Sequence, residues 1–467
     1  MENAQLRQQY PEFIYDSFTI NRLADGFHVE YTYILGEHTF KPQVFIPISD
    51  IKNEWINDDF ISHLFFNFGI INAINYYKLT ISPRMIIRAG KLDADQKAFF
   101  KKLFYNGLGE FLYVNQLNIP YEDFLEIVAE EPDELPEFRI GDDFHGNLIP
   151  VGGGKDSIVT LEALQPMHDE NICFQYNRNI YPENRAAIDS IKFAGYPLSN
   201  SVNFNLTLDE KMLELNKQGF YNGHIPFSSC LAFASVIMAY LTNRAHIVLS
   251  NEASANEGNI PGTNINHQYS KSFEFEQDFR WYLSTYLTNK IDYFSLLRCL
   301  NEYEIVQKFL KNRKYLNIFR SCNVGTHLNK WCAACAKCLY VYIMLYPFVE
   351  RSELINIFGY DMFQNPNLLQ IFIGLYNPDS TKPFECVGTK EEINFCLKLA
   401  LENYNHDIPL PYLLQYYQTY AYNPNINYNV VNYFNQQHAI PQEYLNLITK
   451  LWNKKLSTFW SAKKSSS

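Results

Sequence analysis

The chain has 467 residues, enough for two or three domains with hydrophobic cores. Its 50 acidic and 39 basic side chains give a net charge of −11, which argues against a nucleic-acid partner because such partners require basic surface. No apolar stretch approaches the ~20 residues of a membrane span, and the first residues do not resemble a secretion signal. Nine cysteines, an odd number, suit a reducing compartment. We therefore expect a soluble cytoplasmic protein that binds neither nucleic acid nor membrane.

The first part of the chain favours strands followed by helices. Within residues 15–50, apolar side chains alternate with polar ones, as at Phe27 and Val29, and this pattern predicts a hairpin or meander. Residues 51–135 favour helices, and the acidic, proline-bearing run Glu130–Pro136 predicts a linker. We expect an N-terminal α+β domain over residues 1–135.

The strongest local signal is a junction between a strand, a glycine turn and a helix. A short apolar run at 148–151 predicts a buried strand, three glycines follow at 152–154, and a helix begins near Asp156. Backbone N–H groups converge at such a turn, and together with the positive end of the helix they form an anion site. Lys155 adds a mobile positive charge and Ser157 a hydroxyl donor.

Two better-known phosphate motifs are excluded here. A Walker A loop would need glycine at Ile149 and Ser or Thr at Asp156, and a dinucleotide fingerprint would need glycine at Ser157. The segment instead resembles the S-G-G-x-D-S loop of the PP-loop ATP pyrophosphatases, with Gly152 in place of the leading Ser. The other fixed positions match: Gly153, Gly154, Asp156 and Ser157. The alternative is a purely structural glycine turn in a parallel sheet.

Two further segments add to the predicted site. Asn171–Tyr176 predicts a second strand, which completes a βαβ unit with a parallel sheet. Gln175, Tyr176 and the residues up to Asn179 then lie where such folds hold adenine, at the carboxyl ends of the strands. A later strand, His246–Leu249, runs into a dense polar stretch at 250–272, which is typical of an active-site loop.

Read together, these motifs resemble one enzyme family, the MurL UDP-N-acetyl-α-D-muramoyl-L-alanyl-L-glutamate epimerases. The stretches that carry the resemblance, beside the glycine turn, are Tyr105–Phe111, Asn222-Gly223-His224, Ser250-Asn251-Glu252, Glu257-Gly258-Asn259, Asn266–Ser272 and Trp331–Cys338. The resemblance runs from about residue 60 to 375, and the first fifty and last ninety residues add little. It implies an α/β fold with a parallel-sheet PP-loop domain (adenine nucleotide α-hydrolase-like) at 145–350 and a C-terminal helical region at 351–460.

The resemblance also implies a reaction. The substrate would be UDP-MurNAc-L-Ala-L-Glu, and its terminal L-Glu would be converted to D-Glu for peptidoglycan synthesis. Joining AMP to the carboxylate removes the negative charge beside the α-carbon, so that the α-proton becomes acidic. A base can then remove this proton and an acid can return it to the opposite face. ATP with Mg²⁺ would be consumed to AMP and pyrophosphate.

Residue roles follow from this chemistry. The loop from Gly152 to Ser157 would hold the leaving phosphates, and Asp156 is the first candidate for Mg²⁺, with Glu252 and Glu257 next. Six groups are available as proton carriers: His224, His267, Glu252, Glu257, Tyr269 and Lys271. We favour His267 and Lys271, one helical turn apart if a helix begins at Asn266. His224 could equally cap the helix that follows it, and Tyr269 is one of 34 tyrosines.

Four cysteines have the spacing of a four-thiolate zinc site: Cys322, Cys332, Cys335 and Cys338. A comparable arrangement occurs in 7-cyano-7-deazaguanine synthases, which are also PP-loop proteins with structural zinc. The alternative is a run of free cysteines that packs a helix start. For the whole protein, the alternatives to the epimerase are another PP-loop adenylating enzyme, of the deazaguanine synthase or tRNA-modifying type, and a catalytically inactive nucleotide sensor.

Overall fold

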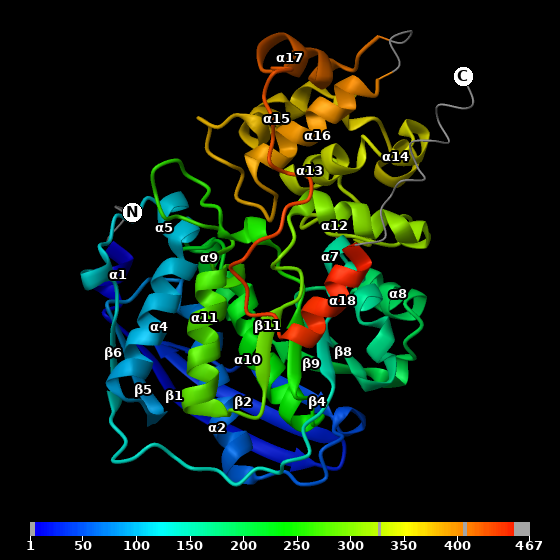
Figure 1. Cartoon of the computed structure of the whole chain (residues 1–467). Helices are drawn as coiled ribbons and strands as arrows, with labels where there is room; N and C mark the ends of the chain where they lie inside the picture. Colours follow the sequence, from blue (N-terminus) through cyan, green and yellow to red (C-terminus); the bar gives the residue numbers. More distant parts are fainter. Residues whose placement is uncertain (1–4, 326–327, 405–408, 453–467) are drawn as a thin grey trace.

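The computed structural model describes residues 5–325, 328–404 and 409–452. These residues form an α/β structure around one 11-stranded sheet, with strand order β11-β10-β7-β8-β9-β4-β2-β1-β5-β6 and β3 paired to β2 (Figure 1). The strands are β1 Glu12–Leu23, β2 Gly26–Leu35, β3 His38–Phe40, β4 Gln43–Pro47, β5 Arg84–Lys91, β6 Glu126–Glu130, β7 Asn147–Pro150, β8 Asn171–Arg178, β9 Ser201–Thr207, β10 His246–Leu249 and β11 Asp292–Ser295.

The N-terminal segment builds one half of this sheet. Strands β1 to β4 pair antiparallel, which confirms the expected meander, and β5 and β6 extend it in parallel. The residues of β2 alternate between the core and the other face, and Tyr33 donates a hydrogen bond of 2.7 Å to the carbonyl of Gly69 on the covering helix. The helices of this segment are α1 Gln5–Gln9, α2 Asp58–Asn72, α3 Ile74–Tyr77, α4 Ala94–Gly107, α5 Gly109–Val114 and α6 Tyr121–Phe124.

The other half of the sheet is parallel, from β9 through β8, β7 and β10 to β11. Its βαβ unit of β7, α7 and β8 confirms the strand–turn–helix expectation. The helices of this part are α7 Lys155–Ala163, α8 Arg185–Phe193, α9 Lys211–Lys217, α10 Phe227–Leu241, α11 Phe273–Tyr282 and α12 Glu302–Phe309. The two halves are joined by antiparallel pairing of β4 with β9, Val44 opposite Leu206. The segments expected as separate domains, 1–135 and 145–350, thus share one sheet.

The C-terminal part is helical and lies beyond the carboxyl edge of the parallel strands (Figure 1). Its helices are α13 Ala336–Leu345, α14 Arg351–Phe358, α15 Leu369–Tyr376, α16 Lys390–Glu402, α17 Tyr412–Tyr420 and α18 Gln442–Trp452. The last of these returns to the sheet, where Tyr444 donates a hydrogen bond of 2.5 Å to the side-chain oxygen of Asn147 on β7. Residues 405–408 and 453–460 of the expected helical region lie outside the described residues.

Among the described residues, no helix combines the length and the apolar character needed to cross a bilayer.

Candidate active site

The glycine turn joins the end of β7 to the start of α7 at Lys155. Gly153 has a φ of +80°, and a Cβ on it would lie 2.5 Å from the backbone nitrogen of Ala187, so this position requires glycine. The turn is held from both sides, because Asn184 donates a hydrogen bond to the carbonyl of Gly152 at 3.1 Å and the backbone N–H of Arg320 donates to Gly153 at 2.9 Å.

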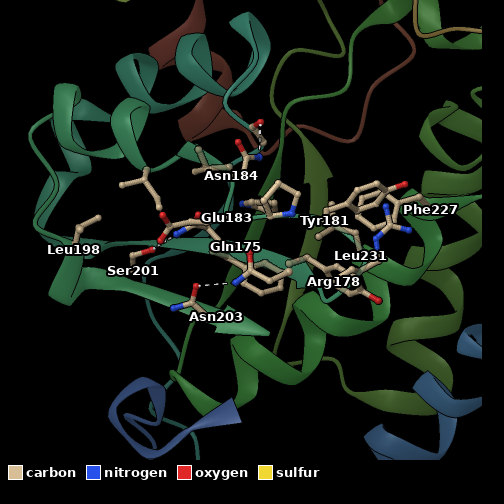
Figure 2. A pocket seen from close by; sticks show the side chains of 18 of the residues that line it. Gln175, Arg178, Tyr181, Glu183, Asn184, Leu198, Ser201, Asn203, Phe227 and Leu231 are labelled. Atoms are coloured by element: carbon tan, nitrogen blue, oxygen red, sulfur yellow. Dashed lines mark hydrogen bonds between the residues drawn. The ribbon is translucent and has the colours of Figure 1, made fainter. Parts of the chain in front are cut away.

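A cavity of about 840 Å³ opens beside this turn (Figure 2). Gly152 lines one side, and Gln175 and Tyr176 line it from the end of β8, so the structure brings three of the predicted ATP-binding residues together. The guanidinium of Arg178 lies 4.6 Å from the ring centre of Tyr181 and 4.7 Å from that of Phe227, which gives the cavity an aromatic and cationic corner. This combination suits a flat ring and an anion.

The other residues of the turn have protein partners. The ammonium of Lys155, 2% exposed, forms ion pairs with Asp156 and with Glu302, which is 1% exposed. Burial favours the neutral amine, but these carboxylates outweigh it and raise the pKa of Lys155. Lys155 is therefore anchored rather than mobile. The hydroxyl of Ser157 donates to the carbonyl of Gly154 at 3.0 Å.

Asp156 is the partly exposed carboxylate of the turn. Burial raises its pKa, but the ammonium groups of Lys155 and Lys337 outweigh this effect, with a smaller contribution from Lys271, and the net shift is downward. Its carboxylate, 26% exposed, therefore stays ionised at the positive end of α7. An ionised carboxylate is the kind of ligand that Mg²⁺ prefers.

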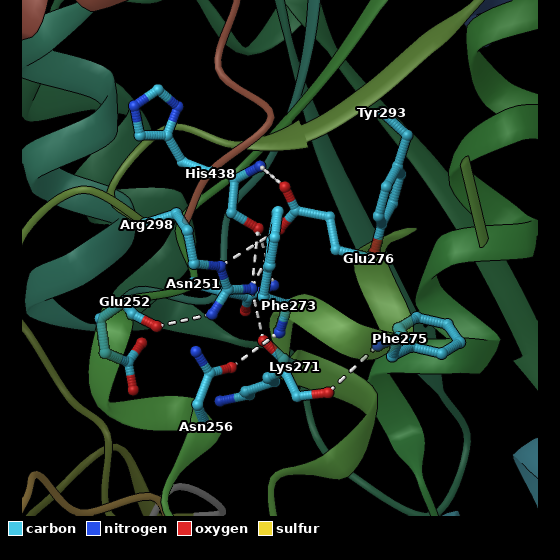
Figure 3. A network of polar contacts seen from close by, with 12 residues as sticks. Asn251, Glu252, Asn256, Lys271, Phe273, Phe275, Glu276, Tyr293, Arg298 and His438 are labelled. Atoms are coloured by element: carbon cyan, nitrogen blue, oxygen red, sulfur yellow. Dashed lines mark hydrogen bonds and ion pairs between the residues drawn. The ribbon is translucent and has the colours of Figure 1, made fainter. Parts of the chain in front are cut away.

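The polar loop at 250–272 is fixed by a buried arginine (Figure 3). Arg298 is fully buried and pairs with Glu276 at 3.0 Å. Its guanidinium also donates to the backbone carbonyls of Glu252 at 2.6 Å and Lys271 at 2.5 Å. Because one planar group binds both ends of the loop, Glu252 and Lys271 are held in fixed positions.

The helix that we expected from Asn266 begins instead at Phe273. The hydroxyl of Ser272 accepts a hydrogen bond of 3.2 Å from the backbone N–H of Phe275 and so caps the helix at this point. Residues Tyr269–Lys271 form only a short 3₁₀ turn. The expected spacing by one α-helical turn is therefore wrong, although the side chains of His267 and Lys271 still meet at a common neighbour.

His267 belongs to a cluster with Glu110 and His224. Its Nδ1 pairs with the carboxylate of Glu110, and its ring centre lies 4.1 Å from that of His224. Burial favours the neutral ring, but hydrogen bonds with Cys386 and Glu110 outweigh it and raise the pKa of His267 to about 9. Burial and the charge of His267 lower the pKa of His224 to about 3. At neutral pH one imidazole is thus protonated and its neighbour is neutral.

Cys386 is the common neighbour. Lys271 donates a hydrogen bond of 3.2 Å to its sulfur, His267 forms another with its thiol, and Lys337 donates to its backbone carbonyl. Burial raises the pKa of a thiol, but the positive charges of Lys271, His267 and Lys337 outweigh it and lower the pKa of Cys386 to about 5.

Of the other predicted catalytic residues, some lie near the lysines of this cluster and others have partners elsewhere. Glu252 is buried and interacts electrostatically with both Lys155 and Lys271. Glu257 faces the C-terminal part, where it pairs with Lys382 at 2.7 Å. Tyr269 is buried against other neighbours, and its hydroxyl bonds with Asn106. His224 does not cap α10, whose N-cap is Pro226.

Four residues of the site were missed by sequence reasoning: Glu110, Glu302, Lys337 and Cys386. Glu110 stands inside the stretch Tyr105–Phe111 that carries the resemblance, so that signal was available. Cys386 has no cysteine or histidine at motif spacing, and only its neighbours in space mark it.

The four predicted zinc ligands come together. Sulfur–sulfur distances are 3.5 Å for Cys335 to Cys338, 3.6 Å for Cys332 to Cys338 and 4.0 Å for Cys322 to Cys335. Zinc–sulfur bonds of about 2.3 Å in a tetrahedron place sulfurs roughly 3.8 Å apart, so this cluster has the dimensions of a zinc site. The backbone N–H of Gly325 also donates to the sulfur of Cys322 at 3.0 Å. The residues present therefore fit the metal.

Comparison with known proteins supports one family. Models of the MurL N-terminal and C-terminal domains match residues 4–296 and 318–412. A protein of Xanthomonas oryzae pv. oryzae is 33% identical to this chain, over 69% of this chain and 71% of its own length. Proteins of Micromonospora sp. and Salinispora tropica are each 32% identical to it over 86% of this chain. These matches cover 89% of the Micromonospora protein and 87% of the Salinispora protein. All three are named UDP-N-acetyl-alpha-D-muramoyl-L-alanyl-L-glutamate epimerase.

The extent of the match corrects one expectation. It begins at residue 4 and reaches residue 412, so the first fifty residues and part of the last ninety do contribute. The reason is structural, because β1–β4 belong to the same sheet as the glycine turn and the loop with Cys386 completes the site. The chain belongs to the MurL family.

Proposed function

We propose that this protein epimerises the terminal L-Glu of UDP-MurNAc-L-Ala-L-Glu to D-Glu through an acyl-adenylate, with consumption of ATP to AMP and pyrophosphate. The observation that carries the proposal is a shared pair of lysines. Lys271 and Lys337 interact electrostatically with Asp156 at the glycine turn and with Cys386 beside His267. The glycine turn and the groups proposed for proton transfer are therefore linked through the same two positive charges.

The adenylation half would use the turn and its cavity. Backbone N–H groups at Gly152–Gly154 and the positive end of α7 would bind the leaving phosphates, and the cavity beside Gln175 and Tyr176 would hold adenine. Asp156 would hold Mg²⁺, which when bound neutralises charge on the phosphates. Lys271 and Lys337 would neutralise the negative charge that develops as the substrate carboxylate attacks the α-phosphorus.

The epimerisation half needs a base and an acid at the same pH. Neighbouring groups whose surroundings push their pKa values apart are suited to these two roles. His224 is neutral, because burial and the charge of His267 lower its pKa to about 3, and its basicity would rise as His267 gives up its proton, so that it could take up the α-proton. His267 has its pKa raised to about 9 and can supply a proton. Among the described residues, the Nε2 atom of His224 is buried and has no hydrogen-bond partner, which leaves it available for substrate.

The four-cysteine cluster would bind a structural zinc ion. It would fix the segment that precedes α13. This segment supports the glycine turn through Arg320, and Lys337 follows it as the second residue of α13. All four ligand positions are protein sulfurs, so zinc here would stabilise the site and would not contact substrate.

The test uses the purified protein with ATP, Mg²⁺ and UDP-MurNAc-L-Ala-L-Glu in D₂O. We expect pyrophosphate release and product with D-Glu that carries deuterium at the α-carbon. Asp156→Asn should abolish both signals, and Glu122→Gln, at an exposed position on α6, should leave both unchanged. Pyrophosphate release without inversion would favour a different adenylating enzyme, and absence of both from the wild type would contradict the proposal.

A further inference from the structure

Cys386 stands in the arrangement of an activated nucleophile. It lies in the loop between α15 and α16 with its thiol hydrogen-bonded to the imidazole of His267, whose Nδ1 pairs with the carboxylate of Glu110. A thiol, an imidazole and a carboxylate in this order form the triad by which cysteine nucleophiles are activated and oriented.

The charges around the sulfur favour the thiolate. Lys271 donates to the sulfur at 3.2 Å, and Lys337 reaches the backbone carbonyl of the same residue. Burial raises the pKa of Cys386, but these charges and His267 outweigh it and lower the pKa to about 5. The described cysteines outside the four-cysteine cluster differ, since burial raises the pKa of each: Cys173, Cys230, Cys299 and Cys396.

The segment that carries the thiol also contacts the lining of the cavity where the adenylate would form. Its chain neighbour Glu385 accepts a hydrogen bond from Asn323, which lines the cavity beside the glycine turn. The lysines that interact with Cys386 interact with Asp156 as well. The thiolate and the turn thus share two lysines, and an acyl group activated at the turn would form near the segment that carries Cys386.

We propose that Cys386 takes the glutamyl group from AMP and that the α-carbon is inverted while it is held as a thioester. This inference rests on the adenylation proposed above. The thiolate sulfur attacks the carbonyl carbon of the acyl-adenylate, a carbon–sulfur bond forms, and the carbon–oxygen bond to phosphate breaks so that AMP leaves with the electron pair. The α-proton is then removed and returned on the opposite face. Water finally attacks the thioester carbonyl, and the carboxylate and the thiolate are restored.

This route gives the neighbouring groups distinct tasks. The thioester carries no negative charge, so its α-proton stays acidic after AMP has left the site. Formation of the thioester also removes the thiolate that pairs with His267, so the protonated imidazole becomes free to act on the acyl group. Overall one ATP and one water still yield AMP and pyrophosphate.

The test is a search for the covalent intermediate. Wild-type protein is mixed with ATP, Mg²⁺ and UDP-MurNAc-L-Ala-L-Glu, quenched in acid within milliseconds to seconds, and measured by intact mass and peptide mapping. We expect an adduct equal to the substrate minus water on the peptide with Cys386, and its removal by neutral hydroxylamine. Cys386→Ala should carry no adduct, and Cys299→Ala, a buried cysteine outside the site, should carry it as the wild type does.

Two kinetic readouts accompany the adduct. ATP–pyrophosphate exchange driven by substrate reports adenylation alone, and in Cys386→Ala it should stay within about threefold of the wild type, since the turn is intact. Deuterium incorporation at the α-carbon should fall by about 10³-fold or more. If the wild type shows ATP–pyrophosphate exchange but no adduct, or an adduct on a residue other than Cys386, the thioester proposal is wrong and the adenylation proposal is kept. Absence of exchange from the wild type would instead overturn the adenylation, and the thioester with it.

Discussion

Lys271 donates a hydrogen bond of 3.2 Å to the sulfur of Cys386, although 115 positions separate the two residues. The lysine comes from the polar loop after β10, and the cysteine comes from the helical C-terminal part. Arg298 holds the backbone of the lysine, and Lys337 holds that of the cysteine. This contact therefore closes the site between the sheet and the C-terminal helices.

Epimerisation should depend on pH through the pair of Cys386 and His267. As pH falls through about 5 the thiolate is protonated, and as pH rises through about 9 the imidazolium loses its proton, so the rate should be highest between these values. The charged and titratable groups that face this pair are Lys271, Lys337, Glu110, His224 and Glu385. The measurement is kcat for inversion from pH 4.5 to 10.

Replacement of Glu110 by Gln tests the alkaline side of this profile. Loss of the carboxylate removes a contribution that raises the pKa of His267. The alkaline limb of the pH–rate profile should therefore move to lower pH, while the acid limb moves less. Glu122→Gln, at an exposed position, serves as the control. An unchanged alkaline limb in Glu110→Gln would show that another group titrates there.

Replacement by alanine should affect the stability of the protein differently at Gly153 and at Gly152. At Gly153 the φ of +80° and the 2.5 Å approach to Ala187 oppose any side chain, and we expect a loss of about 1–3 kcal/mol in the free energy of unfolding, or more if α8 moves. At Gly152 a Cβ would have no atom within 4 Å apart from those of the adjoining residues, so stability should be unchanged. Denaturant melts compare the variants. If the two alanine variants are equally stable, the close packing of Gly153 against Ala187 is contradicted.

The buried pair of Lys155 and Glu302 should matter for folding as well as for catalysis. Lys155→Met leaves the carboxylate of Glu302 buried without its main partner, at a cost of about 3–5 kcal/mol. Lys155→Met combined with Glu302→Gln should recover part of this loss, because the unpaired charge is removed. Thermal melts of the single and double variants measure the coupling. Additive losses would mean that the two side chains do not interact in solution.

The four-cysteine cluster should contain one zinc ion per chain. Elemental analysis should find it in the purified protein, and Cys338→Ser should lose it together with thermal stability, since structural zinc contributes directly to folding. The control is Cys299→Ala, which should keep the metal. If the purified protein lacks metal and all four thiols react with an alkylating reagent, the cluster is a packing feature only.

Much of the fold could be predicted because it rests on short-range patterns. The hairpin of β1 and β2 follows from alternating side chains, and the turn before α7 includes Gly153, whose φ of +80° favours glycine. The four cysteines could be recognised because three of them lie within seven residues, where chain geometry alone brings the sulfurs near one another. In each case the interacting groups are close in sequence, so the sequence alone determines that they meet.

Only the tertiary structure decided the rest. The pairing of β4 with β9 merges two expected domains into one sheet, and the cap at Ser272 starts α11 seven residues later than the polar pattern suggested. Cys386 gains its neighbours because the C-terminal helices pack above the carboxyl edge of the strands, and no local pattern encodes that packing. A thiol becomes a thiolate through the charges around it, and those charges come from distant parts of the chain.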